Sequence, residues 1–300
     1  MSSVLQATDL VKSFGDEPVL GGLNLHVPEG SVYGLVGPNG AGKTTTIKIA
    51  MNILQPSHGR VEVLGVPSQN LGPADFTNIG YVSENQEMPD WMTIEYLLSY
   101  LMPFYPDWDG AYAAELIRQF DLPPHRQIRH LSRGMRMKAA LVSSLAYHPK
   151  LLVLDEPFSG LDPLVREEVI EGLLDSASDT TIFISSHDLS EIESFASHIG
   201  YLDRGRLQFS EEMTSLTSRF REMEVTVEPP AQLPSDRDWP KSWLRPQTTP
   251  AVIRFVETQF EPDRTSNAIR AFFGPVRQIS ANPMSLRAIF ITLARSGSKA

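Results

Sequence analysis

The sequence predicts an α/β fold with a parallel β-sheet, an antiparallel β addition and a helical subdomain, followed by a small α+β appendix. Short apolar segments rich in β-branched residues alternate with longer helical patterns, which is typical of a parallel sheet covered by helices on both faces. The chain has 300 residues, of which 41% are hydrophobic and 21% charged. This length and composition suit a globular protein with one large core or two modest domains.

The expected elements follow one another along the chain in a regular order. We expect the N-terminal strands and the segment 59–65 to form the antiparallel addition. The expected strands of the parallel sheet are Val32–Val36, 78–84, 151–156 and 180–187. The expected helices are 43–54, a mostly helical region over 92–147 that prolines interrupt, 164–176 and 188–197.

A change of composition near residue 220 predicts a domain boundary. The balance of charge shifts there from strongly acidic to slightly basic, and six prolines lie between positions 229 and 250. We therefore expect one domain over 1–220, with a helical subdomain at about 85–148, and an accessory domain over 221–300. The proline-rich segment 229–250 is predicted to be a linker or an irregular loop. In the accessory domain we expect a strand at 251–258 and helices at 265–274 and 283–295.

Composition also limits the class of protein. The net charge of −10 argues against a general nucleic-acid binder, so we expect no nucleic-acid partner. No apolar run approaches the roughly 18 residues of a membrane span, and Asp9 lies where a signal peptide would be apolar. The chain has no cysteine, which excludes disulfides and thiolate metal sites. We expect a cytoplasmic protein.

The segment from Gly37 to Thr44, GPNGAGKT, matches the phosphate-binding pattern G-x-x-x-x-G-K-[ST] between an expected strand and an expected helix. Glycines let backbone N–H groups turn inward around phosphate oxygens, and the helix N-terminus adds partial positive charge. Lys43 is expected to reach the β- and γ-phosphates, and Thr44 to ligate Mg²⁺. A chance glycine turn is the alternative, and the flanking elements argue against it. The predicted phosphate-binding residues are Gly37, Pro38, Asn39, Gly40, Ala41, Gly42, Lys43, Thr44 and Thr45.

Two further apolar strands end on residues suited to phosphate chemistry. LLVLDEP places Asp155 and Glu156 at a strand end, where Asp155 can hold Mg²⁺ and Glu156 can orient or deprotonate an attacking water. His187 ends the segment TTIFISSH and is expected at the carboxyl edge of the sheet, where its ring can contact a γ-phosphate. The alternatives are acidic residues that cap a buried strand, and a histidine with a structural role.

These motifs, with an LSxG segment between them, resemble in order and spacing the nucleotide-binding subunit of ATP-binding-cassette (ABC) transporters, over roughly residues 4–220. The resemblance implies a P-loop ATPase core that binds and hydrolyses ATP with Mg²⁺. The segment LSRGM, Leu131 to Met135, lies where this family places its signature, usually LSGGQ. In that family the signature of one subunit closes over the ATP held in the P-loop of another.

The resemblance assigns further residues, some of which depart from the family pattern. Ser132 and Gly134 match the signature residues that contact the second subunit's ATP, although Ser132 also suits an ordinary helix N-cap. Arg133 and Met135 replace the family's usual glycine and glutamine. Arg133 adds positive charge near phosphate, and Met135 removes a polar amide.

Three other positions match functional residues of the family. Phe14 matches the aromatic residue that stacks on adenine, with a core aromatic as the alternative. Asp162, in SGLD, matches the loop that crosses the dimer interface. Glu84 stands where the family usually has a glutamine, and its carboxylate can still ligate Mg²⁺ and serve the reaction. An exposed acidic residue without a role is the alternative for Glu84.

The resemblance also implies partners. These are an integral membrane permease and a second ATP-binding subunit, in a homodimer or a heterodimer, with the chain peripheral on the inner face of the membrane. The segment 89–108 is crowded with aromatic residues and methionines that suit a docking groove for a permease helix, or else helical core. The appendix weakly resembles the extension of an exporter-like branch.

The alternative to a transporter subunit is a soluble or regulatory ABC-type ATPase. Ribosome-acting relatives usually carry two cassettes, and one is present here. DNA-repair relatives need long coiled-coil arms, and GTPases need an N-K-x-D motif that the sequence lacks. A module that only binds ATP is motivated by the changes at Glu84, Arg133 and Met135. The intact residues that argue against it are Lys43, Asp155, Glu156 and His187.

Overall fold

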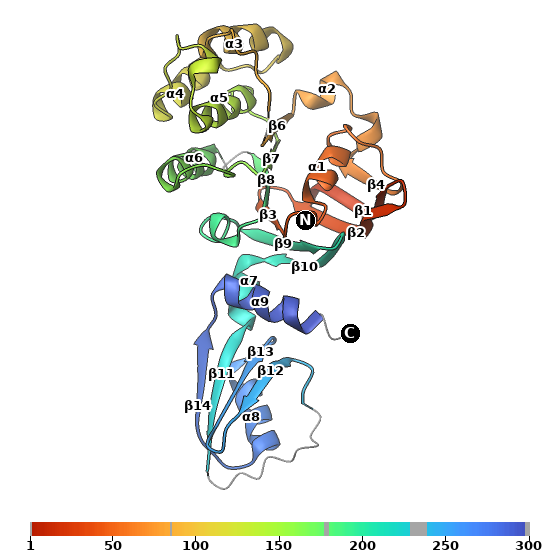
Figure 1. The fold of residues 1–300 in the computed structure, drawn as a ribbon, viewed down its shortest axis with the longest axis vertical. Helices are drawn as coiled ribbons and strands as arrows, with labels where there is room; N and C mark the ends of the chain where they lie inside the picture. The colour runs from red at the N-terminus through yellow and green to blue at the C-terminus, as the bar shows by residue number, and fades with distance from the viewer. Residues whose placement is uncertain (1, 85, 177–179, 229–238, 298–300) are drawn as a thin grey trace. The chain divides into compact units, whose positions relative to one another are not determined.

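The computed structural model describes residues 2–84, 86–176, 180–228 and 239–297 (Figure 1). The chain divides into two compact units, Met1–Ser210 and Glu211–Ala300. The division falls before the boundary that we expected at residue 220. Among the described residues, no helix combines the length and the apolar character that crossing a bilayer requires.

A six-stranded sheet organises the first unit, with the order β10-β9-β3-β8-β7-β6. Strand β3 pairs in parallel with β8 and β9, and β7 pairs in parallel with β6 and β8. Every residue of β3, β7 and β8 is buried, as expected for strands covered on both faces. The strands are β3 (Val32–Val36), β6 (Ile79–Ser83), β7 (Leu151–Asp155), β8 (Thr181–Ser186), β9 (His198–Asp203) and β10 (Arg206–Glu212). The predicted parallel sheet is confirmed, but β9 and β10 were not predicted.

A second sheet of the first unit is the antiparallel addition. Its order is β2-β1-β4-β5, and β1 pairs antiparallel with both β2 and β4. Leu5, Leu23 and Val63 from this sheet share one hydrophobic core with Leu35 of β3 and Ile47 of the P-loop helix. The addition therefore packs against the strand and the helix that flank the P-loop. The strands are β1 (Ser3–Phe14), β2 (Glu17–Pro28), β4 (His58–Val63) and β5 (Val66–Pro67).

The helices of the first unit agree with the expected pattern in most places. They are α1 (Lys43–Ala50), α2 (Pro73–Phe76), α3 (Ile94–Leu101), α4 (Gly110–Gln119), α5 (Arg133–Leu145) and α6 (Pro163–Ser176). Figure 1 shows α3, α4 and α5 grouped together at one end of this unit, and both α3 and α4 contact α5.

Two helix predictions were wrong in extent. Helix α1 ends at Ala50 instead of residue 54, because the chain turns at Met51 and Asn52 takes a positive φ of 55°. The segment 188–197 contains only the 3₁₀ turn η4 (Leu189–Glu191). There, Asp188 Oδ1 accepts hydrogen bonds from the backbone N–H and the hydroxyl of Ser190, and such local bonds of short polar side chains compete with a helix.

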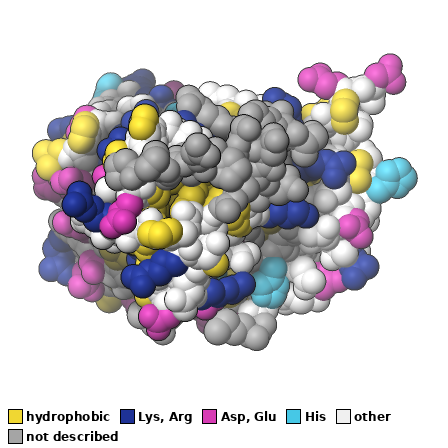
Figure 2. All heavy atoms as spheres, turned by 90° about the horizontal axis from the view of Figure 1, so that it is seen from below, with side chains coloured by type: hydrophobic (Ala, Val, Ile, Leu, Met, Phe, Trp, Pro, Cys, Tyr) yellow, Lys and Arg dark blue, Asp and Glu magenta, His cyan; other side chains and the backbone are white. Residues whose placement is uncertain are grey.

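The second unit is an antiparallel sheet with helices. Its order is β12-β13-β11-β14. Trp243 stacks on Phe255 at 4.3 Å between ring centroids, within an aromatic cluster that also contains Phe273. In Figure 2, which views the molecule from below, basic and acidic side chains are interspersed on the visible described surface. The elements are α7 (Met213–Arg219), β11 (Arg221–Val227), β12 (Trp243–Thr248), β13 (Val252–Glu257), α8 (Pro262–Phe273), β14 (Val276–Pro283) and α9 (Leu286–Gly297).

The prediction of an irregular proline-rich loop over 229–250 was wrong for its last part. Residues 229–238 lie outside the described chain, but strand β12 occupies Trp243–Thr248. This strand lies at the sheet edge, and its register with β13 shifts between Leu244 and Gln247, around Pro246. Proline is tolerated at an edge strand or bulge because no ladder hydrogen bond is needed there.

Burial of the central sheet gives a stability prediction. Phe183 in β8 is fully buried, so Phe183→Ala should lower the free energy of unfolding by about 3–5 kcal/mol. Leu164 is 66% exposed, and Leu164→Ala should change it by about 0.5 kcal/mol or less. Urea denaturation followed by circular dichroism measures both. Equal effects of the two substitutions would contradict the burial of Phe183.

Candidate active site

The P-loop joins the end of β3 to the start of α1 and requires glycine at specific positions. A Cβ atom at Gly37 would lie 2.1 Å from the carbonyl oxygen of Leu202. Gly40 and Gly42 have positive φ angles of 80° and 109°, a region that favours glycine. These constraints let the backbone curl tightly before the N-terminus of α1, as a phosphate cradle requires.

Lys43 is buried at the first position of α1 and points back across the loop. Its Nζ donates to the carbonyl oxygens of Gly37 at 2.7 Å and Pro38 at 3.3 Å. It also lies 3.1 Å from Oε1 of Glu156, and the two side chains are only 5% and 10% exposed. An incoming phosphate must compete with these acceptors for the ammonium group.

Asp155, Thr44 and Ser185 form a connected polar group beside Lys43. Asp155 Oδ1 accepts hydrogen bonds from Thr44 Oγ1 at 3.0 Å and from Ser185 Oγ at 2.7 Å. Burial raises the pKa of Asp155, and the hydrogen bonds from Ser185 and Thr44 oppose that rise. The Ser185 hydroxyl also accepts from the backbone N–H of Glu156 at 3.0 Å. Sequence reasoning missed Ser185, although it lies two residues before His187 at a strand end.

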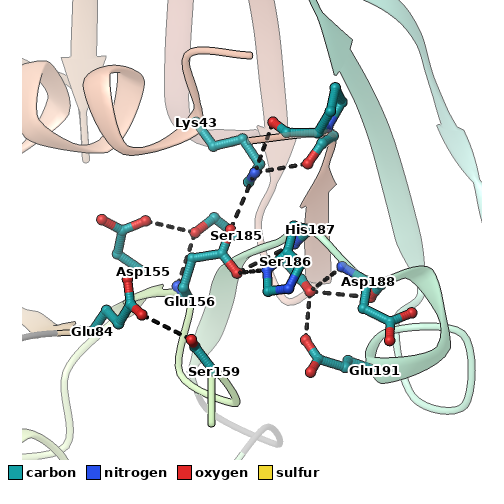
Figure 3. A network of polar contacts seen from close by, with 12 residues as sticks. Lys43, Glu84, Asp155, Glu156, Ser159, Ser185, Ser186, His187, Asp188 and Glu191 are labelled. Atoms are coloured by element: carbon teal, nitrogen blue, oxygen red, sulfur yellow. Dashed lines mark hydrogen bonds and ion pairs between the residues drawn. The ribbon is translucent and has the colours of Figure 1, made fainter. Parts of the chain in front are cut away.

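Glu156 is held between a cation and a histidine (Figure 3). Its Oε2 accepts from the backbone N–H of His187 at 3.2 Å and lies 2.7 Å from His187 Nδ1. Glu156 has a positive φ of 52°, which is uncommon for a non-glycine residue and often marks a functional site. This backbone turn directs the carboxylate toward Lys43 and His187.

Glu84 follows β6 and reaches the same region from the other side. Its Oε1 accepts from Ser159 Oγ at 2.8 Å and lies 3.3 Å from Arg133 Nη2. Glu84, Glu156 and His187 line one cavity of about 440 Å³ together with the P-loop. The remaining described lining residues are Glu17, Val19, Asn39, Gly40, Ala41, Gly42, Lys43, Thr44, Thr45 and Ser159. Sequence reasoning missed Glu17 and Val19, which carry no motif.

The predicted residues Ser132, Gly134 and Asp162 are not among the described residues that line this cavity. Ser132 Oγ accepts from the Met135 backbone N–H at 3.2 Å and caps α5, while Asp162 Oδ1 accepts from the Val165 N–H at 3.1 Å. Gly134 is buried against α6, where a Cβ would lie 2.7 Å from Val165 Cγ1. Their contact with a second subunit's ATP stays a prediction.

Phe14 ends β1 and is 50% exposed. The ammonium group of Lys12 lies 4.9 Å from the centroid of its ring. The structure therefore places Phe14 on the surface and argues against the alternative of a core aromatic. Its predicted stacking on adenine stays a prediction.

Comparisons with known proteins agree with this geometry. The ABC transporter family model matches residues 20–159. The ABC transporter ATP-binding protein YtrB of Bacillus subtilis (strain 168) is 30% identical over 227 residues, covering 75% of this chain and 77% of that protein. The bacitracin transport ATP-binding protein BcrA of Enterococcus faecalis is 33% identical over 227 residues, covering 74% and 73%.

A solved structure of an ATP-binding subunit of an ABC transporter superposes with a TM-score of 0.65 at 26% identity, covering 72% of this chain and 92% of that one. The chain belongs to the family of ABC transporter ATP-binding proteins. It is an ATP-binding and ATP-hydrolysing subunit of this type, as the resemblance in the sequence predicted.

The contact between His187 and Glu156 predicts a measurable titration. The hydrogen bond to Glu156 raises the pKa of His187 above its ordinary 6.5, against the opposing effect of burial. The stabilisation from this pair is therefore fully present below pH 6.5 and is lost as pH rises through the raised pKa. An NMR titration of the His187 ring should show the raised pKa, and Glu156→Gln should lower it. An equal His187 pKa in both proteins would contradict the contact.

Proposed function

We propose that the P-loop cavity binds ATP through the phosphates, with Lys43 contacting the β- and γ-phosphates and Thr44 and Asp155 holding Mg²⁺. The observation that carries this proposal is the convergence of Lys43, Thr44, Asp155, Glu156 and His187 at one edge of the parallel sheet. Thr44 Oγ1 and Asp155 Oδ1 are adjacent oxygen donors, which fits Mg²⁺ bound by one or two protein oxygens plus phosphates. When bound there, Mg²⁺ would neutralise part of the phosphate charge.

Glu156 is the proposed general base of hydrolysis. Its carboxylate lies at the cavity wall, where it can orient a water and accept its proton. His187 keeps Glu156 in place through the ring and the backbone N–H, and its partly exposed ring is available to a γ-phosphate. Phe14 is proposed to stack on adenine, and Glu84 to approach the metal-bearing phosphates.

We also propose that two ATP-binding subunits close around two ATP molecules. Ser132, Gly134 and Asp162 then serve the nucleotide of the other subunit. The N-cap of Ser132 at the 13-residue helix α5 supports this, because a helix N-terminus favours an anion. Since each ATP bridges two chains, dimerisation depends on ATP.

The second proposed partner is an integral membrane permease, which places the chain on the inner face of the membrane. Exposed aromatic side chains near the start of the helical subdomain form a surface that suits contact with a permease. Tyr96 and Tyr100 are four residues apart on α3, so they lie on one face, and they are 51% and 53% exposed. Trp91 and Phe104 extend the same apolar surface, because their ring centroids lie 5.6 Å from that of Tyr96 and 5.7 Å from that of Tyr100 respectively. They are 61% and 60% exposed. Such a surface suits a short helix of the permease.

Hydrolysis gives the direct test of the enzymatic proposal. Glu156→Gln should slow ATP turnover by about 10²–10⁴-fold, because the general base is lost while the P-loop remains. Steady-state phosphate release by the purified protein measures this, with Leu174→Ala as an exposed control. Equal background turnover in the parent and the Glu156→Gln variant would favour a regulatory module that only binds ATP.

Co-purification tests the permease surface. The double variant Trp91→Ala with Tyr100→Ala should recover at least about tenfold less of a polytopic membrane protein than the parent, because two exposed aromatic contacts are removed. Mass spectrometry of gently solubilised, affinity-tagged complexes measures the recovery. The control Leu174→Ala removes a 45% exposed apolar side chain elsewhere. Equal recovery from both variants would overturn the assignment of this surface.

A further inference from the structure

The two charged departures from the family pattern lie against each other in the fold. Glu84 and Arg133 are 49 residues apart in sequence, yet Arg133 Nη2 lies 3.3 Å from Glu84 Oε1. The family places a neutral glutamine and a glycine at these positions, so the two changes introduce opposite charges. Ser159 Oγ donates to the same carboxylate oxygen at 2.8 Å. Both bonds therefore use Oε1, and neither uses Oε2.

Arg133, within the predicted signature, extends from the start of α5 to the SGLD loop. A Cβ atom at Gly160 would lie 2.6 Å from Arg133 Nη1, so the glycine leaves the space that the guanidinium occupies. Gly160 also has a positive φ of 67°. Arg133 thus joins three segments that carry predicted nucleotide contacts: Glu84, the start of α5 and the SGLD loop.

The position of Arg133 creates a need for an anion. It is the first residue of α5, and a cation at a helix N-terminus opposes the helix dipole. Glu84 supplies the compensating charge, and a phosphate can supply it equally well because guanidinium binds carboxylate and phosphate in the same forked geometry. The two side chains are 53% and 38% exposed, so both can change partner without leaving a buried charge unpaired.

Glu84 also faces the nucleotide side of this arrangement. It lines the P-loop cavity as well as a neighbouring cavity of about 900 Å³ to which Arg133 belongs. A cation bound beside a nucleoside triphosphate in the P-loop cavity would therefore be a second positive charge within the surroundings of this carboxylate, in addition to Arg133. If the carboxylate moves toward such a cation, its contact with Arg133 weakens.

We propose that Glu84 and Arg133 form a charge-exchange switch between the two nucleotide sites of a dimer. Without nucleotide, Glu84 holds Arg133. When Glu84 turns to the cation beside a bound triphosphate, Arg133 is released to a phosphate oxygen of the triphosphate on a second copy of this chain. The switch rests on the proposed function and makes loading of one site promote closure over the other, and by linkage the reverse.

A double-mutant cycle in the Glu156→Gln background tests the switch. The variants are Glu84→Gln, Arg133→Gln and their combination, with Arg133→Lys as the conservative replacement. ATP-dependent dimerisation is measured by sedimentation velocity, once with Mg²⁺ and once with EDTA. Arg136→Gln is the matched control, because it removes a cation from the same helix and cavity that donates instead to the carbonyl of Arg129. Thermal melting and monomer ATP binding verify that each variant is folded.

The switch predicts that the effect of changing Glu84 on ATP-dependent dimerisation requires Arg133. With Mg²⁺, Arg133→Gln should weaken the dimer at least about tenfold, because a charge-assisted contact with phosphate is lost. Arg133→Lys should weaken the dimer less than Arg133→Gln does, because the positive charge is kept. Arg136→Gln should change dimerisation by about twofold or less. With EDTA, Glu84→Gln should strengthen the dimer about 5–150-fold, because Arg133 is free without a cation. This gain should vanish when Arg133→Gln is also present.

Three results separate failure of the switch from failure of the proposed function. If the parent dimerises with ATP but Glu84→Gln gives the same gain in EDTA with and without Arg133, the switch is wrong and simple charge repulsion explains the effect. The same conclusion follows if Glu84→Gln gives no gain. If the parent shows no ATP-dependent dimer at all, the proposed function falls and the switch falls with it.

Discussion

The buried ion pair between Lys43 and Glu156 is the interaction on which the rest of the active site depends. Either charge alone would be costly beneath the P-loop, and pairing at 3.1 Å compensates both. The pair exists because Lys43 begins the helix after β3 and Glu156 directly follows β7. In the sheet, β8 lies between these strands and pairs in parallel with both, so their carboxyl ends meet at one edge. The sheet topology therefore brings the two charges together.

The same edge supplies the residues that keep the pair in position. The hydroxyl of Ser185 in β8 donates a hydrogen bond to Asp155 and accepts one from the backbone N–H of Glu156. His187 directly follows β8, and its ring contacts Oε2 of Glu156, the oxygen that does not face Lys43. In the proposed mechanism, an entering phosphate would offer Lys43 a new anionic partner and leave Glu156 beside that phosphate with His187. Nucleotide binding and the placement of the proposed general base would then be two consequences of one exchange of ionic partners.

The residues of the P-loop and of the strand ends could be predicted because their chemistry is local. Gly42, Lys43 and Thr44 follow one strand in an unbroken motif, and the apolar runs before Asp155 and His187 are typical of buried parallel strands. The contact of Glu84 with Arg133 could not be predicted, because it depends on how the helical subdomain folds against the end of β6.

The remaining differences between prediction and structure arise where the local sequence pattern did not indicate the element that forms. Strand β10 alternates between exposed and partly buried positions without a continuous apolar run. In the segment after His187, the side chain of Asp188 replaces helical hydrogen bonds. Pro246 suggested a loop, but an edge position in the second unit accepts it. In each case a tertiary position or a side-chain hydrogen bond outweighed the sequence pattern.

Equilibrium binding of Mg·ATP tests the exchange of ionic partners at Lys43 most directly. Isothermal titration calorimetry would compare the parent with Glu156→Gln and Lys43→Ala. Glu156→Gln should bind ATP at least as tightly as the parent, because Lys43 loses the carboxylate that competes with phosphate. Lys43→Ala should bind at least about tenfold more weakly, because charge-assisted contacts are lost. Equal weakening by both substitutions would contradict the central role of this ion pair.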